Sequence, residues 1–169
     1  MKAVHNFCAG PSLLPQTVYE QAAQAVLNFE NTGMSILSIS HRSKEFIAAL
    51  EEARHLSLEL LGLDKKGYVA LFLQGGASME FLRIPYNLMQ QKAAYINTGT
   101  WSSKAIEQAQ MLGEVKVVAS SEDQHFSYIP KEVRVEEAVD YLHFTSNNTI
   151  HGTQFNYLPQ TNAPLVCDM

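Results

Sequence analysis

The chain has 169 residues, of which 46% are apolar and 17% are charged, and its formal net charge is -5. This composition is typical of a globular protein with one domain, which buries roughly 70% of its unfolded surface. The acidic balance argues against a nucleic-acid partner, and no apolar run reaches the roughly 18 residues that a membrane span needs.

The first sixty residues predict two amphipathic helices. Pro15 opens a pattern in which apolar residues recur at helical spacing, and a second such pattern begins near Ser43 and ends before Gly62. The N-terminal segment MKAVHNFCAGPS has no apolar stretch and does not fit a secretory signal. Cys8 and Cys167 lack C-x-x-C spacing, which favours reduced thiols in a cytoplasmic protein.

The rest of the chain predicts strands that alternate with helices. The expected strands are 68–73, 93–96, 115–119, 141–145 and 164–168. Helical segments are expected after Ser78, where Pro85 should kink or delimit the helix, and after Trp101. This alternation predicts an α/β domain with a largely parallel sheet, in which ligands gather at the carboxyl ends of the strands.

A glycine-rich segment, QGGAS, follows the first expected strand and leads into a helix. Its glycines allow a ligand to approach the backbone of Gly76, Ala77 and Ser78 closely, and free N–H groups at a helix N-terminus suit a phosphate. Gly-Gly before a helix also fits a plain tight turn. The segment matches neither the G-x-G-x-x-G nor the G-K-[ST] pattern, which lowers the case for a dinucleotide or a nucleoside triphosphate.

Other strand ends carry an aromatic ring, hydrogen-bonding groups and an acid. Trp101, the only tryptophan, could stack on a planar ligand or fill a core. Thr149 lies in SNNTIHGT, which could bind a ligand or form an Asx turn, and Asp168 follows the last strand. Together the strand ends suit pyridoxal 5'-phosphate, because this cofactor has a phosphate, a flat ring and a ring nitrogen that a carboxylate keeps protonated.

Several segments resemble the phosphoserine aminotransferase family, whose members are class-V, fold-type I pyridoxal-phosphate enzymes. In chain order they are FCAGPSLLP, SISHRSKEF, LQGGAS, NTGTWSSKA and TSNNTIHGTQF, and they extend over essentially the whole chain. The resemblance implies the three-layer α/β/α large domain of an aspartate-aminotransferase-like fold, incomplete in this chain. It implies that residues 1–15 contribute to the small domain or an interface and that residues 16–169 begin the cofactor-binding large domain.

The resemblance also implies roles for the residues at the strand ends. Gly76, Ala77 and Ser78 would hold the cofactor phosphate. Trp101 would stack on the pyridine ring, Thr149 would bond the 3'-oxygen side, and Asp168 would pair with the ring nitrogen.

The resemblance places the substrate contacts on His41 and Arg42, which would bind an anionic group, as a planar guanidinium does well. In a homodimer Arg42 could serve the partner's site. Some family members carry an arginine where this chain has Ser78, so the contacts to the substrate phosphate stay open.

By the same resemblance, the full-length protein would transfer an amino group between glutamate and 3-phosphohydroxypyruvate, giving phosphoserine and 2-oxoglutarate. This reaction serves serine biosynthesis, and the use of pyridoxine-pathway substrates stays open. The Schiff-base lysine is expected beyond Met169, so this chain alone should hold no catalytic lysine and should be inactive without a carboxyl-terminal portion.

Two readings from other classes compete with the enzyme. One is a non-catalytic ligand-binding module derived from an aminotransferase scaffold. The other is a flavodoxin-like binding domain, which would leave SHRSKEF and Trp101 unexplained.

Overall fold

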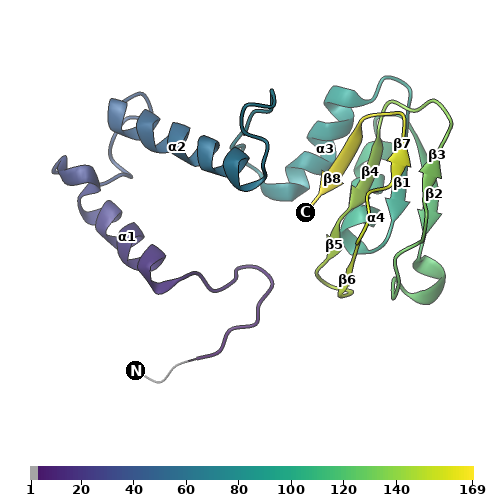
Figure 1. Cartoon of the computed structure of the whole chain (residues 1–169), viewed down its shortest axis with the longest axis horizontal. Helices are drawn as coiled ribbons and strands as arrows, with labels where there is room; N and C mark the ends of the chain where they lie inside the picture. The colour runs from purple at the N-terminus through teal and green to yellow at the C-terminus, as the bar shows by residue number, and fades with distance from the viewer. Residues whose placement is uncertain (1–3) are drawn as a thin grey trace. The chain divides into compact units, whose positions relative to one another are not determined.

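A four-stranded parallel sheet with the order β2-β1-β4-β8 organises residues 73–169 of this computed structural model, which describes residues 4–169 (Figure 1). The strands are β1 (Lys92–Asn97), β2 (Glu114–Ser120), β4 (Leu142–Thr145) and β8 (Leu165–Asp168). The two central strands, β1 and β4, are buried almost throughout, as apolar strands of a parallel sheet are. The strands expected at 93–96, 115–119, 141–145 and 164–168 are confirmed.

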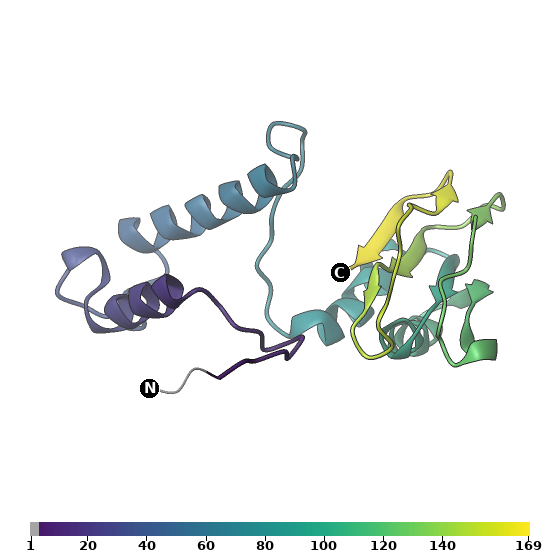
Figure 2. The same cartoon turned by 60° about the horizontal axis from the view of Figure 1, so that its bottom comes forward.

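Helices α3 (Gly76–Leu88) and α4 (Thr100–Gln110) cover one face of this sheet (Figure 2). Phe81 from α3 and Ile106 from α4 join Tyr95 from β1 in one buried apolar cluster. The Tyr95 and Tyr141 hydroxyls lie 2.7 Å apart beneath the helices and satisfy each other. This face therefore combines an apolar core with one buried pair of hydrogen-bonded tyrosine hydroxyls.

Short strands and loops cover the opposite face within residues 73–169. Val135 and Phe155 join Phe144 of β4 in a second buried cluster. The short strands form two pairs: β3 (Arg134–Val135) with β7 (Gln160–Thr161), which are parallel, and β5 (Asn147–Asn148) with β6 (Thr153–Gln154), which are antiparallel. This part of the chain thus contributes the sheet and one helical layer of the expected α/β/α arrangement.

Residues 4–72 belong to a separate compact unit. It contains α1 (Gln16–Leu27), a short 3-10 turn η1 (Phe29–Asn31) and α2 (Lys44–Leu60). Pro15 directly precedes α1, and the Ser43 hydroxyl caps α2 by accepting the Phe46 N–H at 3.3 Å. The two helices predicted to begin near Pro15 and Ser43 are confirmed.

The expectation of a strand at 68–73 is wrong, and of the two effects expected of Pro85 the end of the helix is excluded. Residues 68–73 pair with no strand in the described part of the chain, and Leu71 is 65% exposed. An apolar run becomes a strand only when a neighbouring strand supplies hydrogen bonds, and sequence alone does not show that neighbour. Pro85 does not delimit α3, because the helix continues to Leu88; the ring removes one N–H donor while the Met89 N–H still bonds the Pro85 carbonyl at 3.0 Å.

His143 of β4 is a buried histidine whose polar groups are not satisfied. Its ring is stacked on Tyr95 with the ring centroids 4.8 Å apart, and neither ring nitrogen has a hydrogen-bond partner among residues 4–169. Burial lowers the pKa of His143 to about 4. The folded protein therefore holds this ring neutral at pH values where the unfolded chain would protonate it.

The buried histidine should make the full-length protein sensitive to acid. Because the folded pKa of His143 lies below its unfolded value of about 6.5, the unfolded chain binds more protons and stability falls as the pH drops from about 6.5 toward 4. The loss that His143 contributes is about 3 kcal/mol at the acid end. We expect His143→Phe to lose less stability than the wild type between pH 7 and pH 4.5 in urea unfolding; equal losses in the two proteins would contradict this account.

Candidate functional site

One pocket, with a volume of about 270 Å³, lies at the carboxyl ends of β1, β4 and β8. Its lining residues are Ala77, Ser78, Phe81, Trp101, Asn147, Thr149, Asp168 and Met169. All the residues predicted to bind the cofactor line this pocket except Gly76, which directly precedes Ala77. In Figure 1 the end of β8 lies beside the start of α3, which explains how Asp168 meets Ala77 and Ser78 across a long stretch of sequence.

The first turn of α3 presents backbone N–H groups at the pocket. Gly75 precedes the helix with a φ of 103°, in the left-handed region, and a Cβ at this position would lie 2.0 Å from Met79 Cγ. Only glycine fits such a turn. The helix has no side-chain cap at its N-terminus, so the N–H groups near Gly76, Ala77 and Ser78 stay available to an anion.

Trp101 and Thr149 form a hydrogen-bonded pair on the pocket wall. The Trp101 Nε1–H donates to Thr149 Oγ1 at 3.0 Å, which fixes the indole and leaves the Thr149 hydroxyl proton free to donate to a ligand. On the same ring, Lys104 Nζ lies 4.8 Å from the centroid of the indole, within the range of a cation–π contact. The wall is therefore flat, oriented and able to donate one hydrogen bond.

A buried network that sequence reasoning missed positions the start of α4 and hence Trp101. Asn97 Oδ1 lies 2.9 Å from Ser102 Oγ and 3.0 Å from Ser103 Oγ, and Ser102 Oγ accepts the N–H groups of Thr98 and Gly99 at 2.9 Å each. The segment NTGTWSS carries these polar residues around the tryptophan. Several polar residues follow a buried apolar strand within this short segment. Because buried polar groups are nearly always paired, their number could have indicated a hydrogen-bonded network.

Gly99 leaves room for the loop that carries Thr149. A Cβ at Gly99 would lie 2.8 Å from Asn148 Oδ1 and 2.9 Å from His151 Cδ2. Asn148 is buried, and its Nδ2 donates to Thr153 Oγ1 at 3.1 Å. The loop at Gly99 and the loop that carries Thr149 can therefore approach this closely only because glycine has no side chain.

Asp168 lies at the tip of β8 opposite Thr145 of β4. Its carbonyl accepts the Ser146 N–H at 2.8 Å, which fixes the backbone at the pocket. Burial raises the pKa of the Asp168 carboxyl, and the Thr145 hydroxyl partly opposes that rise. No ion pair involves Asp168 within residues 4–169, so a cationic ligand would stabilise its charged form.

His41 and Arg42 lie in the other unit, in the turn before α2, and both side chains are exposed. The Arg42 N–H donates to Ser40 Oγ at 3.2 Å, which shapes the turn. The part that these two residues play in a site stays a prediction.

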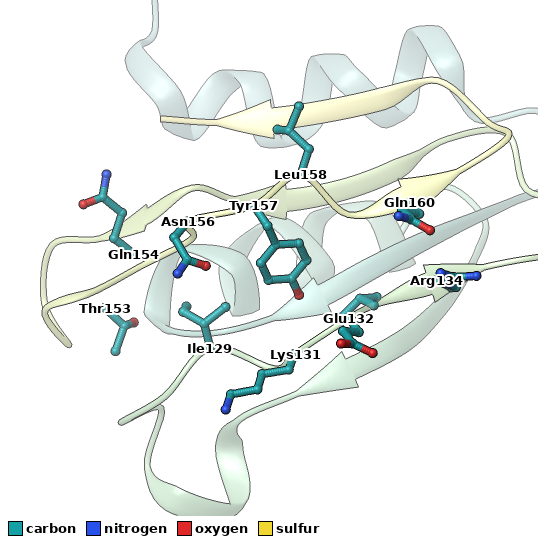
Figure 3. A pocket seen from close by; sticks show the side chains of 11 residues that line it. Ile129, Lys131, Glu132, Arg134, Thr153, Gln154, Asn156, Tyr157, Leu158 and Gln160 are labelled. Atoms are coloured by element: carbon teal, nitrogen blue, oxygen red, sulfur yellow. The ribbon is translucent and has the colours of Figure 1, made fainter.

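A larger cavity of about 760 Å³ lies between residues 129–134 and 153–160 (Figure 3). Tyr157 projects into it, but its hydroxyl already donates to the Pro130 carbonyl at 2.5 Å. Lys131 and Arg134 lie apart in this view and do not converge on one point. The cavity contains none of the predicted site residues, so the smaller pocket is the candidate site.

Two further features bear on the class of site. Across residues 4–169, no helix is both long enough and apolar enough to cross a membrane. The same residues bring no group of three or more His, Cys, Asp or Glu side chains together as metal ligands.

Comparisons with known proteins agree with the resemblance found in the sequence. Residues 4–168 match the aminotransferase class-V family. The phosphoserine aminotransferase of Flavobacterium johnsoniae is 59% identical over 167 residues, which are 98% of this chain and 47% of the relative. That of Parabacteroides distasonis is 53% identical over 165 residues, 98% of this chain and 46% of the relative. The chain spans about half the length of the curated relatives it matches.

Solved structures give the same picture of the fold. A phosphoserine aminotransferase studied for radiation damage of its Schiff base has a TM-score of 0.94 at 44% identity, over 100% of this chain and 48% of that one. The enzyme from Bacillus circulans has a TM-score of 0.90 at 43% identity, over 97% of this chain and 46% of that one. A PLP-bound phosphoserine aminotransferase from Trichomonas vaginalis has a TM-score of 0.82 at 34% identity, over 97% of this chain and 47% of that one. The expected aspartate-aminotransferase-like α/β fold is confirmed.

Proposed function

We propose that this chain, which belongs to the aminotransferase class-V family, forms the first part of a pyridoxal-phosphate-dependent phosphoserine aminotransferase. The proposed reaction moves an amino group between glutamate and 3-phosphohydroxypyruvate and yields phosphoserine and 2-oxoglutarate. The observation that carries the proposal is that Ala77, Ser78, Trp101, Thr149 and Asp168 line the same pocket. Each of these residues suits one group of pyridoxal 5'-phosphate.

The chemistry of the pocket fits pyridoxal 5'-phosphate. The uncapped first turn of α3 suits the phosphate, with backbone N–H groups near Gly76, Ala77 and Ser78 as donors. The indole of Trp101 offers a flat surface for the ring, and the free hydroxyl proton of Thr149 suits the 3'-oxygen.

Asp168 supplies the electrostatic part of the proposal. When bound, the cofactor acts as an electron sink, provided that its ring nitrogen is protonated. The Asp168 carboxylate is the pocket side chain that can hold this proton on the nitrogen, and the resulting cation in turn favours the charged carboxylate. Binding should therefore lower the pKa of Asp168, whose burial raises it in the free protein.

His41 and Arg42 are proposed to bind an anionic group of the substrate. Ser78, in the first turn of α3, is neutral, and no arginine lines the pocket among the described residues. An exposed guanidinium in the turn before α2 can reach outward, and in the proposed homodimer Arg42 could contribute to the partner's site. Residues 1–15 are proposed to contribute to the small domain or interface.

Arg42→Ala should weaken the use of the phosphorylated substrate in the full-length protein. Loss of a charged, two-pronged hydrogen bond typically costs about ten- to a hundredfold in binding. We expect KM for 3-phosphohydroxypyruvate to rise by that factor while cofactor absorbance stays unchanged. Lys44→Ala, a neighbouring cation lost from the same region, is the control; kinetics of Arg42→Ala equal to those of the control would remove Arg42 from the site.

The catalytic lysine is proposed to come from residues beyond Met169, as part of the same protein or a second chain. The full-length relatives are about twice as long as this chain, which leaves room for that lysine.

The protein is further proposed to act in the cytoplasm, in serine biosynthesis, with pyridoxine-pathway substrates as a second use.

Turnover and cofactor attachment test the proposed function together. The full-length protein should convert glutamate and 3-phosphohydroxypyruvate, and borohydride reduction followed by digestion should label one lysine beyond Met169. Residues 1–169 alone should show neither turnover nor specific labelling. A full-length protein that binds ligands without turnover would favour the non-catalytic module, and labelling of a lysine within residues 1–169 would contradict the proposed division of the site.

A further inference from the structure

Thr145 closes β4 directly beside Asp168. The two residues are register partners on neighbouring parallel strands, so their side chains leave the sheet on the same face. Thr145 is 1% exposed, whereas Asp168 is only partly buried and lines the pocket. A hydroxyl that is shut off from water therefore sits behind a carboxyl group that faces a ligand site.

The Thr145 hydroxyl lacks a partner, which is unusual for a buried polar group. Its Oγ1 makes no hydrogen bond of full geometry with any described residue. The hydroxyl nevertheless lowers the pKa of the Asp168 carboxyl, against the effect of burial, from its place opposite that residue on the neighbouring strand. Buried hydroxyls are nearly always paired in folded proteins. A small rotation of the Thr145 side chain would allow its hydroxyl to donate a hydrogen bond to the Asp168 carboxyl.

We propose that Thr145 is a positioning residue for Asp168: its hydroxyl donates to the Asp168 carboxylate, keeps it ionised and holds it toward the pocket. The inference rests on the proposed function, in which that carboxylate meets the protonated ring nitrogen of the cofactor. An ionised carboxylate only accepts hydrogen bonds, so a hydroxyl donor behind it strengthens the charged form. The branched Cβ of threonine limits χ1 rotation and keeps the donor in place.

A purely structural role for Thr145 makes a different prediction. If the side chain only fills space in the core, then valine, which has nearly the same shape, serves as well. If the hydroxyl positions Asp168, then serine preserves the effect and valine removes it.

The test compares the full-length apoprotein as wild type, Thr145→Val and Thr145→Ser. In protein labelled with carboxyl-¹³C aspartate, the Asp168 signal is assigned by its loss in Asp168→Asn and then titrated. We expect Thr145→Val to raise the Asp168 pKa by about one unit and Thr145→Ser to leave it near the wild-type value. The dissociation constant for added pyridoxal 5'-phosphate should rise about three- to tenfold in Thr145→Val and less than about twofold in Thr145→Ser.

If the Asp168 carboxyl in Thr145→Val titrates with the same pKa as in the wild type, the inference is overturned. If Thr145→Val does not fold, Thr145→Ala provides the same comparison without the hydroxyl. Failure of the wild-type protein to bind pyridoxal 5'-phosphate would instead overturn the proposed function, and the apoprotein titration would still decide whether Thr145 holds Asp168.

Discussion

Asp168→Asn in the full-length protein is expected to lower kcat by about a hundredfold or more. Asparagine keeps the size of the side chain and its place at the end of β8, but it cannot hold a proton on the cofactor's ring nitrogen. Removing one member of a buried ion pair costs about 3–5 kcal/mol, which corresponds to roughly 150- to 5,000-fold in rate where the pair is needed in the transition state. Steady-state kinetics with saturating cofactor measures the loss.

Asp123→Asn is the matched control for this change. Asp123 is exposed in the 3-10 turn η2 (Glu122–Gln124), where it accepts the Tyr128 hydroxyl at 2.8 Å, and it does not line the pocket. The same change of carboxylate to amide should leave kcat within about twofold there, as surface changes usually do. A kcat for Asp168→Asn within threefold of the control would show that Asp168 does not act on the cofactor.

Replacement of Trp101 should separate the contribution of the ring from that of its N–H group. Trp101→Ala removes the flat wall of the pocket, and loss of a buried aromatic contact costs about 2–4 kcal/mol. The dissociation constant for pyridoxal 5'-phosphate should therefore rise roughly 30- to 1,000-fold. Trp101→Phe keeps an aromatic face but loses the donor to Thr149, so its loss should be smaller, about tenfold.

The order of the two Trp101 variants decides between the roles. Binding of cofactor to the dialysed full-length apoprotein, followed by absorbance, gives both constants. If Trp101→Phe binds as weakly as Trp101→Ala, the indole N–H and its bond to Thr149 matter more than stacking. If both variants bind as the wild type does, the indole is a structural residue outside the site.

Much of the candidate site could be predicted because parallel sheets bring their carboxyl ends to one edge. The apolar runs at 93–96 and 141–145 defined the two central strands of the sheet, which are buried on both faces. Once these strands were placed, the residues that follow them, such as Trp101 and Thr149, had to lie near one another. Strand placement and chemistry therefore predicted the pocket, and the resemblance supplied the individual roles.

The features that were missed depend on long-range geometry. Residues 68–73 have the composition of a buried strand, yet pairing is a property of two segments and cannot be read from one. The hydrogen bonds that Ser102 and Ser103 donate to Asn97 arise from a helix turn, and the position of Thr145 beside Asp168 arises from strand register. The polar residues of NTGTWSS gave a signal without partners, and Thr145 looks like an ordinary strand residue in the sequence, so neither contact could be assigned from sequence alone.

A structure of the full-length protein with pyridoxal 5'-phosphate bound would test the central claim most directly. The account predicts the phosphate at the N–H groups of Gly76, Ala77 and Ser78, the ring against Trp101 and the ring nitrogen at Asp168. Cofactor bound in the larger cavity beside Tyr157, or a ring nitrogen that faces away from Asp168, would contradict it.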